Sequence, residues 1–253
     1  MKLLLPICVF AVSLLTISFS TKNLNKKIAK EKDGFALVEL FTSEGCSSCP
    51  PADIILEEVQ KKYSDKNVLV LSYHVDYWDK LGWKDIFSNA LFTERQEYYS
   101  NIFGLNSIYT PQAVVNGKKE FIGSNKSKVI NSINEQLNEK LAASITLNAT
   151  QKNTGKIDVS YPAYGSDSKN TQLILLLVQK MAINKIMRGE NEGKTLRHTN
   201  VVREIIYLHN TVKETLAIFN FPSELKKDDV FVVSIIQENK SGEIKAIQIS
   251  SIQ

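Results

Sequence analysis

The 253-residue sequence has little glycine, proline or cysteine: eleven Gly, six Pro and three Cys. So few glycines and prolines exclude a collagen-like or low-complexity chain. Charged residues make up 23% and hydrophobic residues 43%, a balance that excludes a disordered or coiled-coil protein. A basic stripe is also missing, because the net charge of +4 comes from scattered lysines and arginines, so we expect no nucleic-acid partner. This length suits one large domain or two ordinary ones.

A long apolar run stands at the N-terminus, where Lys2 is followed by mostly apolar residues from Leu3 to Phe19. The run ends in Ser18-Phe19-Ser20, with small residues where a signal peptidase favours them. We therefore predict that residues 1–20 are a cleaved signal peptide and that the protein is exported, periplasmic or secreted. The alternative is an uncleaved membrane anchor, because about seventeen apolar residues approach the length that spans a bilayer. Only that alternative implies a membrane partner.

Two cysteines remain once the signal peptide has taken Cys8 with it, and they stand three residues apart, at Cys46 and Cys49. Two cysteines placed at random would show this spacing only about once in a hundred chains. An exported protein that relied on structural disulfides would usually have more cysteines, spaced farther apart. The spacing therefore indicates dithiol chemistry, with a small structural disulfide as the alternative.

The dithiol is predicted to lie at the start of a helix between two buried strands. Residues 35–41 and 67–73 are nearly continuous in apolar residues, which is typical of strands buried on both faces. Between them, apolar residues recur at helical spacing: Ala52, Ile55, Leu56, Val59 and Tyr63. Strand, Cys-x-x-Cys, helix and strand make a right-handed βαβ unit whose parallel strands end at one edge of the sheet. The lysine-rich residues 21–33 before it are predicted to be a linker.

This placement predicts thiol–disulfide exchange. A thiolate at a helix N-terminus is stabilised by the helix dipole and by free N–H groups, which lower its pKa. We predict that Cys46 is the nucleophile that attacks a substrate disulfide and that Cys49 resolves the mixed disulfide. His74 follows the second strand at the same edge, and either supports the thiolate or is simply a hydrogen-bonded residue at a strand end. The partners would be protein disulfides or thiols, and no cofactor is expected.

Two other hypotheses stay open. Cys46, Cys49 and His74 are soft ligands that would suit Cu(I), as in a copper-type metallochaperone. Alternatively, the protein is a redox-inert interaction protein in which the dithiol has no role. The direction of exchange is not set by the spacing, because it depends on the relative stability of the two redox states.

The order of the remaining elements leads to a resemblance. Helical patterns over 85–103 and 126–141 enclose a hairpin at Asn116-Gly117. With Cys-x-x-Cys at the first helix and Thr110-Pro111 before the third strand, residues 34–141 resemble the thioredoxin superfamily. The resemblance implies that Thr110 and Pro111 are the family's cis-proline pair, packed against the dithiol. The chain also resembles an exported bacterial family of thioredoxin-like proteins of unknown function, through Phe41–Asp53, His74–Asp79, Tyr109–Gln112 and Arg188–Asn191.

From residue 142 the pattern changes to short alternating runs. Seven predicted strands with turn signals between them are typical of a β-sandwich, so the fold class predicted is an α/β thioredoxin-like domain (34–141) followed by an all-β sandwich-like domain (142–253). Residues 180–200 are predicted to be a long loop, of the kind that is usually functional or mobile. Arg188, Glu190 and His198 are expected to decorate this loop, and only the family resemblance gives them weight.

Overall fold

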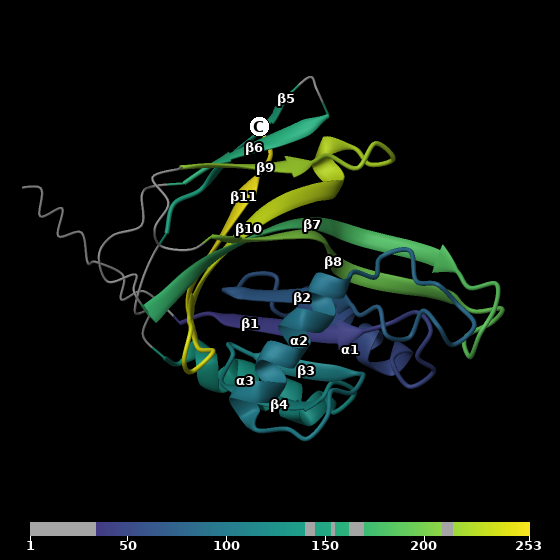
Figure 1. Ribbon diagram of the computed structural model, residues 1–253. Coiled ribbons are helices and arrows are strands. Elements are labelled where there is room, and N and C mark those ends of the chain that lie inside the picture. Colours follow the sequence, from purple (N-terminus) through teal and green to yellow (C-terminus); the bar gives the residue numbers. More distant parts are fainter. Residues whose placement is uncertain (1–33, 140–144, 153–154, 162–169, 209–214) are drawn as a thin grey trace, which may run out of the picture. The chain divides into compact units, whose positions relative to one another are not determined.

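The computed structural model describes residues 34–139, 145–152, 155–161, 170–208 and 215–253 (Figure 1). The predicted signal peptide and linker lie outside these residues. Within the described ranges, no helix is long and apolar enough to cross a membrane. The fold is a mixed α/β arrangement with an eight-stranded sheet and a three-stranded sheet.

The predicted βαβ unit is present. It consists of β1 (Ala36–Thr42), α1 (Pro50–Lys62) and β2 (Val68–His74). The two strands pair in parallel along their whole length, from Ala36 opposite Val68 to Thr42 opposite His74. They therefore end together at one edge of the sheet, as the sequence predicts.

The elements that follow are α2 (Ala90–Phe103), β3 (Gln112–Val115), β4 (Lys119–Ile122) and α3 (Lys126–Leu137). The Asn116-Gly117 hairpin is confirmed, with φ of 49° and 66° at these residues, as a turn of this kind requires. Helix α2 begins later than the predicted residue 85, because the Asn89 side chain caps it by accepting the Leu91 N–H at 3.0 Å.

All seven strands predicted after residue 142 are present: β5 (Asn148–Lys152), β6 (Lys156–Ser160), β7 (Thr171–Lys185), β8 (Thr195–Leu208), β9 (Leu216–Asn220), β10 (Val230–Glu238) and β11 (Ile244–Ser251). Their arrangement differs from a separate sandwich. Four of them extend the sheet of the first half, in the order β11-β10-β7-β8-β2-β1-β3-β4, and the other three form the small sheet β5-β6-β9. Periodicity shows which strand faces are buried, but not which strands pair.

The junction between the halves lies between β8 and β2. Ser72 pairs in parallel with Val201, and the Ser72 hydroxyl donates to the Thr199 carbonyl oxygen at 2.9 Å. The buried Asn200 side chain donates to the Val70 carbonyl oxygen at 2.9 Å. Side-chain hydrogen bonds therefore add to the few backbone contacts that join β8 to β2.

The predicted loop over 180–200 is wrong for most of its length. Strand β7 runs to Lys185 and β8 begins at Thr195, and these two residues are paired at the end of a long antiparallel hairpin. The charged residues that indicated a loop are strand residues exposed to solvent: Lys180, Lys185 and Arg197. Only residues 186–194, here called the hairpin tip, connect the strands. The tip lies at the same end of the molecule as the loops after β1 and β2 (Figure 1).

The apolar run in β7 is explained by burial on both faces. Ile174, Leu176 and Val178 pack into one core with Phe92 and Tyr99 of α2. The alternate residues Leu173, Leu175 and Leu177 pack into a second core with the small sheet. A third core holds α1 and α3 against the other face of β1, β2 and β3.

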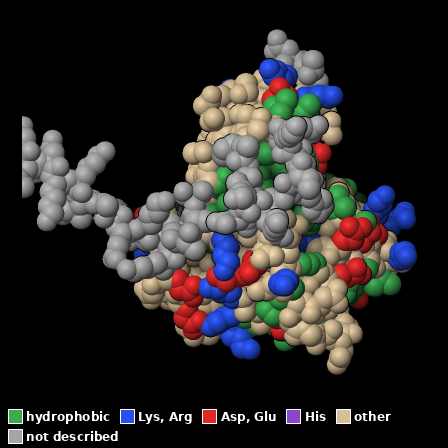
Figure 2. All heavy atoms as spheres, turned by 60° about the vertical axis from the view of Figure 1, so that its left-hand side comes forward, with side chains coloured by type: hydrophobic (Ala, Val, Ile, Leu, Met, Phe, Trp, Pro, Cys, Tyr) green, Lys and Arg blue, Asp and Glu red, His purple; other side chains and the backbone are tan. Residues whose placement is uncertain are grey.

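A buried polar network also joins the two halves. Arg95 of α2 donates from Nε to Glu39 Oε1 of β1 at 2.7 Å, and from Nη1 to Gln237 Oε1 of β10 at 3.2 Å. Its Nη2 donates to the Tyr99 hydroxyl at 3.1 Å. The charges at the surface, in contrast, are exposed to solvent. Basic and acidic side chains are interspersed on the face shown in Figure 2. The buried Arg95–Glu39 pair lies within the first half, and the hydrogen bond from Arg95 to Gln237 links it to the second half.

Candidate functional site

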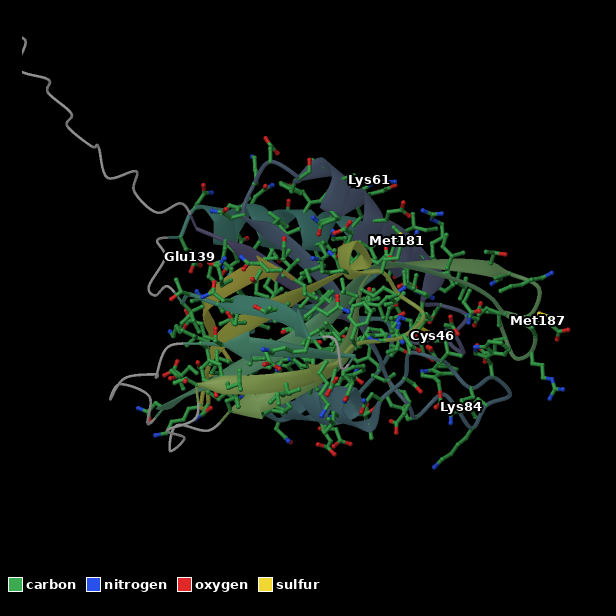
Figure 3. All side chains as sticks on the ribbon, turned by 90° about the horizontal axis from the view of Figure 1, so that it is seen from above. Cys46, Lys61, Lys84, Glu139, Met181 and Met187 are labelled. Atoms are coloured by element: carbon green, nitrogen blue, oxygen red, sulfur yellow. A yellow bond between two sulfur atoms is a disulfide. The ribbon has the colours of Figure 1, made fainter. Side chains whose placement is uncertain are left out.

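Three segments meet at the edge where β1 and β2 end. They are the loop after β1 (residues 43–49), the loop after β2 (residues 75–89) and the hairpin tip. Figure 3 shows labelled residues of all three, Cys46, Lys84 and Met187, at one end of the molecule, with Glu139 at the opposite end. The predicted nucleophile thus lies among segments that are far apart in the sequence.

Cys46 and Cys49 form a disulfide, with their Cα atoms 5.4 Å apart. Cys49 is the N-cap residue of α1, so the disulfide lies at the helix N-terminus. Pro50 and Pro51 occupy the first helical positions, where a missing N–H costs no intrahelical hydrogen bond. Both cysteines are fully buried, whereas Ser47 and Ser48 between them are exposed.

The Thr110–Pro111 peptide bond is cis, as the resemblance implies. Trp78, from the loop after β2, connects it to the dithiol loop. The indole N–H of Trp78 donates to Thr110 Oγ1 at 2.8 Å. A Cβ atom on Gly45 would lie 3.4 Å from the Trp78 Cβ, so the tryptophan also packs directly against the residue before Cys46.

A buried group of charges surrounds His198 of β8. Its Nδ1 lies 3.4 Å from Asp53 Oδ1, in the first turn of α1, and its Nε2 lies 3.5 Å from Glu44 Oε1, two residues before Cys46. Glu44 also accepts hydrogen bonds from the Trp83 indole at 2.8 Å and from the Asn184 amide at 3.0 Å. His198 is 1% exposed, so the expectation that it decorates a loop is wrong.

This environment changes the charge state of His198. Burial lowers the pKa of the imidazole, but the carboxylates of Asp53 and Glu44 outweigh it and raise the pKa to about 10. The ring is therefore a cation at neutral pH. It balances one of the two negative charges beside the dithiol loop.

His74 lies in the same buried polar cluster as His198. Its Nδ1 lies 2.6 Å from Asp85 Oδ2, and its ring packs edge-on against the ring of His198, with centroids 4.5 Å apart. Burial raises the pKa of Asp85. His74 and the backbone N–H groups of Glu44 and Phe87 lower it by more than burial raises it, so the net shift is downward. His74 thus lies in the layer of charges around His198, at the edge where it was predicted.

The copper hypothesis requires Cys46, Cys49 and His74 to converge on one ion. Among the described ranges, no three His, Cys, Asp or Glu side chains are placed so that they could hold a metal ion. In this oxidised form, both sulfur atoms are bonded to each other and His74 contacts Asp85. These three residues therefore form no metal site in this structure.

The hairpin tip binds the dithiol loop directly. The Asn191 amide donates to the carbonyl oxygens of Glu44 at 2.8 Å and Cys46 at 2.9 Å. The Glu190 carboxylate accepts the Ser47 N–H at 3.1 Å. Two residues of the Arg188–Asn191 segment, which the sequence left without a role, therefore contact the Cys-x-x-Cys loop.

The charge on His198 predicts an unusual alkaline loss of stability. Because the pKa is raised from 6.5 to about 10, the stabilisation is fully present below about pH 6.5 and is lost as the pH rises to about 10. In that window we expect the free energy of unfolding to fall by about 1.4 kcal/mol per pH unit at most. Urea unfolding at pH 6.5, 8 and 9.5 measures this. His198→Gln should flatten the profile, and an equal slope in both proteins would contradict the assignment.

Comparisons with known proteins found solved structures that are similar to this chain. A structure of a protein from Agrobacterium tumefaciens is similar, with a TM-score of 0.60 and 25% identity over 86% of this chain and 95% of that chain. HBP35 of Porphyromonas gingivalis is similar in fold, with a TM-score of 0.59 and 14% identity over 87% of this chain and 76% of that chain. No curated protein sequence matches the chain.

The model of a family described as protein of unknown function (DUF1223) matches residues 37–237. That range includes the disulfide, the cis-proline, the buried charges and the hairpin tip. The chain therefore belongs to the DUF1223 family.

Proposed function

We propose that the protein is an exported, thioredoxin-like thiol–disulfide oxidoreductase that exchanges disulfides with protein or small thiol substrates. The observation that carries this proposal is the Cys46–Cys49 disulfide at the N-terminus of α1. A thiolate formed there is stabilised by the helix dipole. Pro50 and Pro51 carry no N–H, and the N–H groups of Cys49 and Ala52 donate to backbone carbonyl oxygens, so the dipole acts without free N–H donors in this turn. Such a dithiol can alternate between the two redox states without unfolding the helix that presents it.

In the reduced protein, the Cys46 thiolate attacks one sulfur of a substrate disulfide. A bond forms between Cys46 and that sulfur, and the other substrate sulfur leaves as a thiolate that takes up a proton. Cys49 then loses its proton and attacks Cys46 Sγ. The Cys46–Cys49 disulfide forms, the substrate leaves with its second thiol, and the two electrons have passed to the substrate. The reverse sequence oxidises a substrate dithiol.

The buried charges support this chemistry. A nearby negative charge disfavours a thiolate, and Glu44 and Asp53 bring two carboxylates close to the dithiol loop. The cationic ring of His198 lies between them, 3.5 Å and 3.4 Å away. We assign His198 the role of a counter-charge that limits this electrostatic cost. The His74 ring packs edge-on against the His198 ring, and Asp85 contacts His74 in turn.

Exposed apolar side chains at the same end favour a protein substrate. Leu81 and Ile86 in the loop after β2 are 57% and 64% exposed, and Ile183 and Met187 in the hairpin are 57% and 59% exposed. Apolar groups exposed together near a reactive site are typical of surfaces that bind other proteins. We expect these side chains to bind an unfolded protein segment that has apolar residues beside a cysteine.

The redox equilibrium of the pair tests the proposal. Purified protein equilibrated with glutathione buffers should cycle reversibly, with a potential between about −270 and −120 mV, the range of exchange catalysts. The fraction reduced is measured by alkylation and mass spectrometry without denaturant. A potential below about −300 mV would identify a structural disulfide and overturn the proposal. Thiols that react only after metal is removed would favour the copper hypothesis instead.

A further inference from the structure

Asn191 has an unusual environment for a residue in a hairpin tip. Its side chain is fully buried, although its neighbours Arg188, Glu190 and Glu192 are exposed. Both of its donor bonds go to the dithiol loop, at the carbonyl oxygens of Glu44 and Cys46, and its Oδ1 accepts from Lys194 Nζ at 2.9 Å. The amide is therefore satisfied only while the tip sits on this loop.

Two further contacts hold the tip in place. The Glu190 carboxylate accepts the Ser47 N–H, which lies between the two cysteines in the sequence. Gly189 packs so closely on the loop after β2 that a Cβ atom there would lie 3.1 Å from the Trp83 Cβ. The tip thus contacts both other segments of the site.

These contacts join the tip to the backbone of a dithiol loop whose cysteines are both 0% exposed. A substrate sulfur must approach Cys46 Sγ directly, so a covering segment has to move first. Within the tip, Ile186 is fully buried and anchors the base. Residues 187–193 beyond it are held to the dithiol loop by a few hydrogen bonds, and segments held in this way open at low cost. The strands behind it are paired along the hairpin and need not separate.

We propose that the hairpin tip is a cap over the dithiol, and that Asn191 is the positioning residue that holds this cap closed until a substrate displaces it. The inference rests on the proposed function for its meaning, since a cap matters only if the dithiol reacts. It adds an access step to that function, in which the Asn191 amide gives up its bonds to Glu44 and Cys46 before sulfur chemistry begins.

The test compares reduction of the disulfide by a small reagent, dithiothreitol, and by a bulky one, a two-cysteine peptide, in native protein. Asn191→Ala removes two hydrogen bonds that close the cap, so we expect the peptide to react about tenfold faster, with a smaller change for dithiothreitol. Glu192→Ala, at the exposed neighbouring position, is the matched control and should react as the wild type does. A merely structural effect would change both reagents alike.

Hydrogen exchange at the Ser47 amide gives a readout that does not depend on reduction. It should become about tenfold faster in Asn191→Ala. If that variant does not fold, Glu190→Ala, which removes another contact of the tip at an exposed position, should likewise speed the reaction of the peptide more than that of dithiothreitol. Equal peptide rates and equal Ser47 exchange in variants and wild type would overturn the cap. A pair that never reduces in native protein would overturn the proposed function, while Ser47 exchange would still decide whether the tip opens.

Discussion

Replacing Arg95 by methionine is expected to destabilise the protein by about 3–5 kcal/mol, because it leaves a buried carboxylate without its cation. Arg95 is 1% exposed and Glu39 is fully buried, with 2.7 Å between Arg95 Nε and Glu39 Oε1. The Tyr99 hydroxyl is the other donor to Glu39 that would remain. Urea unfolding at pH 7, followed by tryptophan fluorescence, measures the loss.

Arg197→Met is the matched control. Arg197 pairs with Glu57 at 3.8 Å with its side chain 51% exposed, so its loss should cost less than about 1 kcal/mol. The double variant Glu39→Gln with Arg95→Met should recover part of the loss, since neither charge then stays buried and unpaired. A loss for Arg95→Met no greater than that of the control would contradict a stabilising role of the buried Arg95–Glu39 pair.

Much of the fold could be predicted from the spacing of apolar residues, because this spacing indicates which faces of the helices and strands are buried. The βαβ unit, the Asn116-Gly117 hairpin and the seven later strands follow from local patterns. Strand pairing could not be predicted, since the junction of β8 with β2 rests on contacts such as that of Ser72 with Thr199, which are distant in the sequence. The exposed charges of the β7–β8 hairpin also resemble those of a loop.

The candidate site could also be predicted only in part, where its residues have a local sequence signal. Cys46 and Cys49 stand out through their spacing, and Thr110-Pro111 through the resemblance to the thioredoxin superfamily, and the structure brings all four residues to one end. His198 and Asn191 were missed because their partners lie about 145 residues away along the chain. A local signal exists for the tip, since Gly189 and Gly193 flank Asn191 and both adopt positive φ. Two glycines so close together indicate a tight turn, but not what the turn covers.

Serine substitutions of the two cysteines should have opposite consequences. In reduced Cys49→Ser protein, Cys46 can still attack glutathione disulfide, forming a bond to one glutathione while the other leaves as a thiol. No second cysteine can then release the adduct, so the mixed disulfide should accumulate. In Cys46→Ser protein only Cys49 remains. We expect almost no adduct, because we assign the attack on the substrate disulfide to Cys46 and not to Cys49. Both variants should lose catalytic turnover, because neither can form the intramolecular disulfide that releases the substrate.

Intact mass spectrometry of these variants, each reduced, freed of reductant and mixed with glutathione disulfide in native buffer, is the most direct test of the central claim. The account predicts a nearly complete single adduct on Cys49→Ser, almost none on Cys46→Ser, and a reformed intramolecular disulfide in the wild type. Equal adducts on both variants, or none on either, would contradict the assignment of Cys46 as the nucleophile and Cys49 as the resolving cysteine.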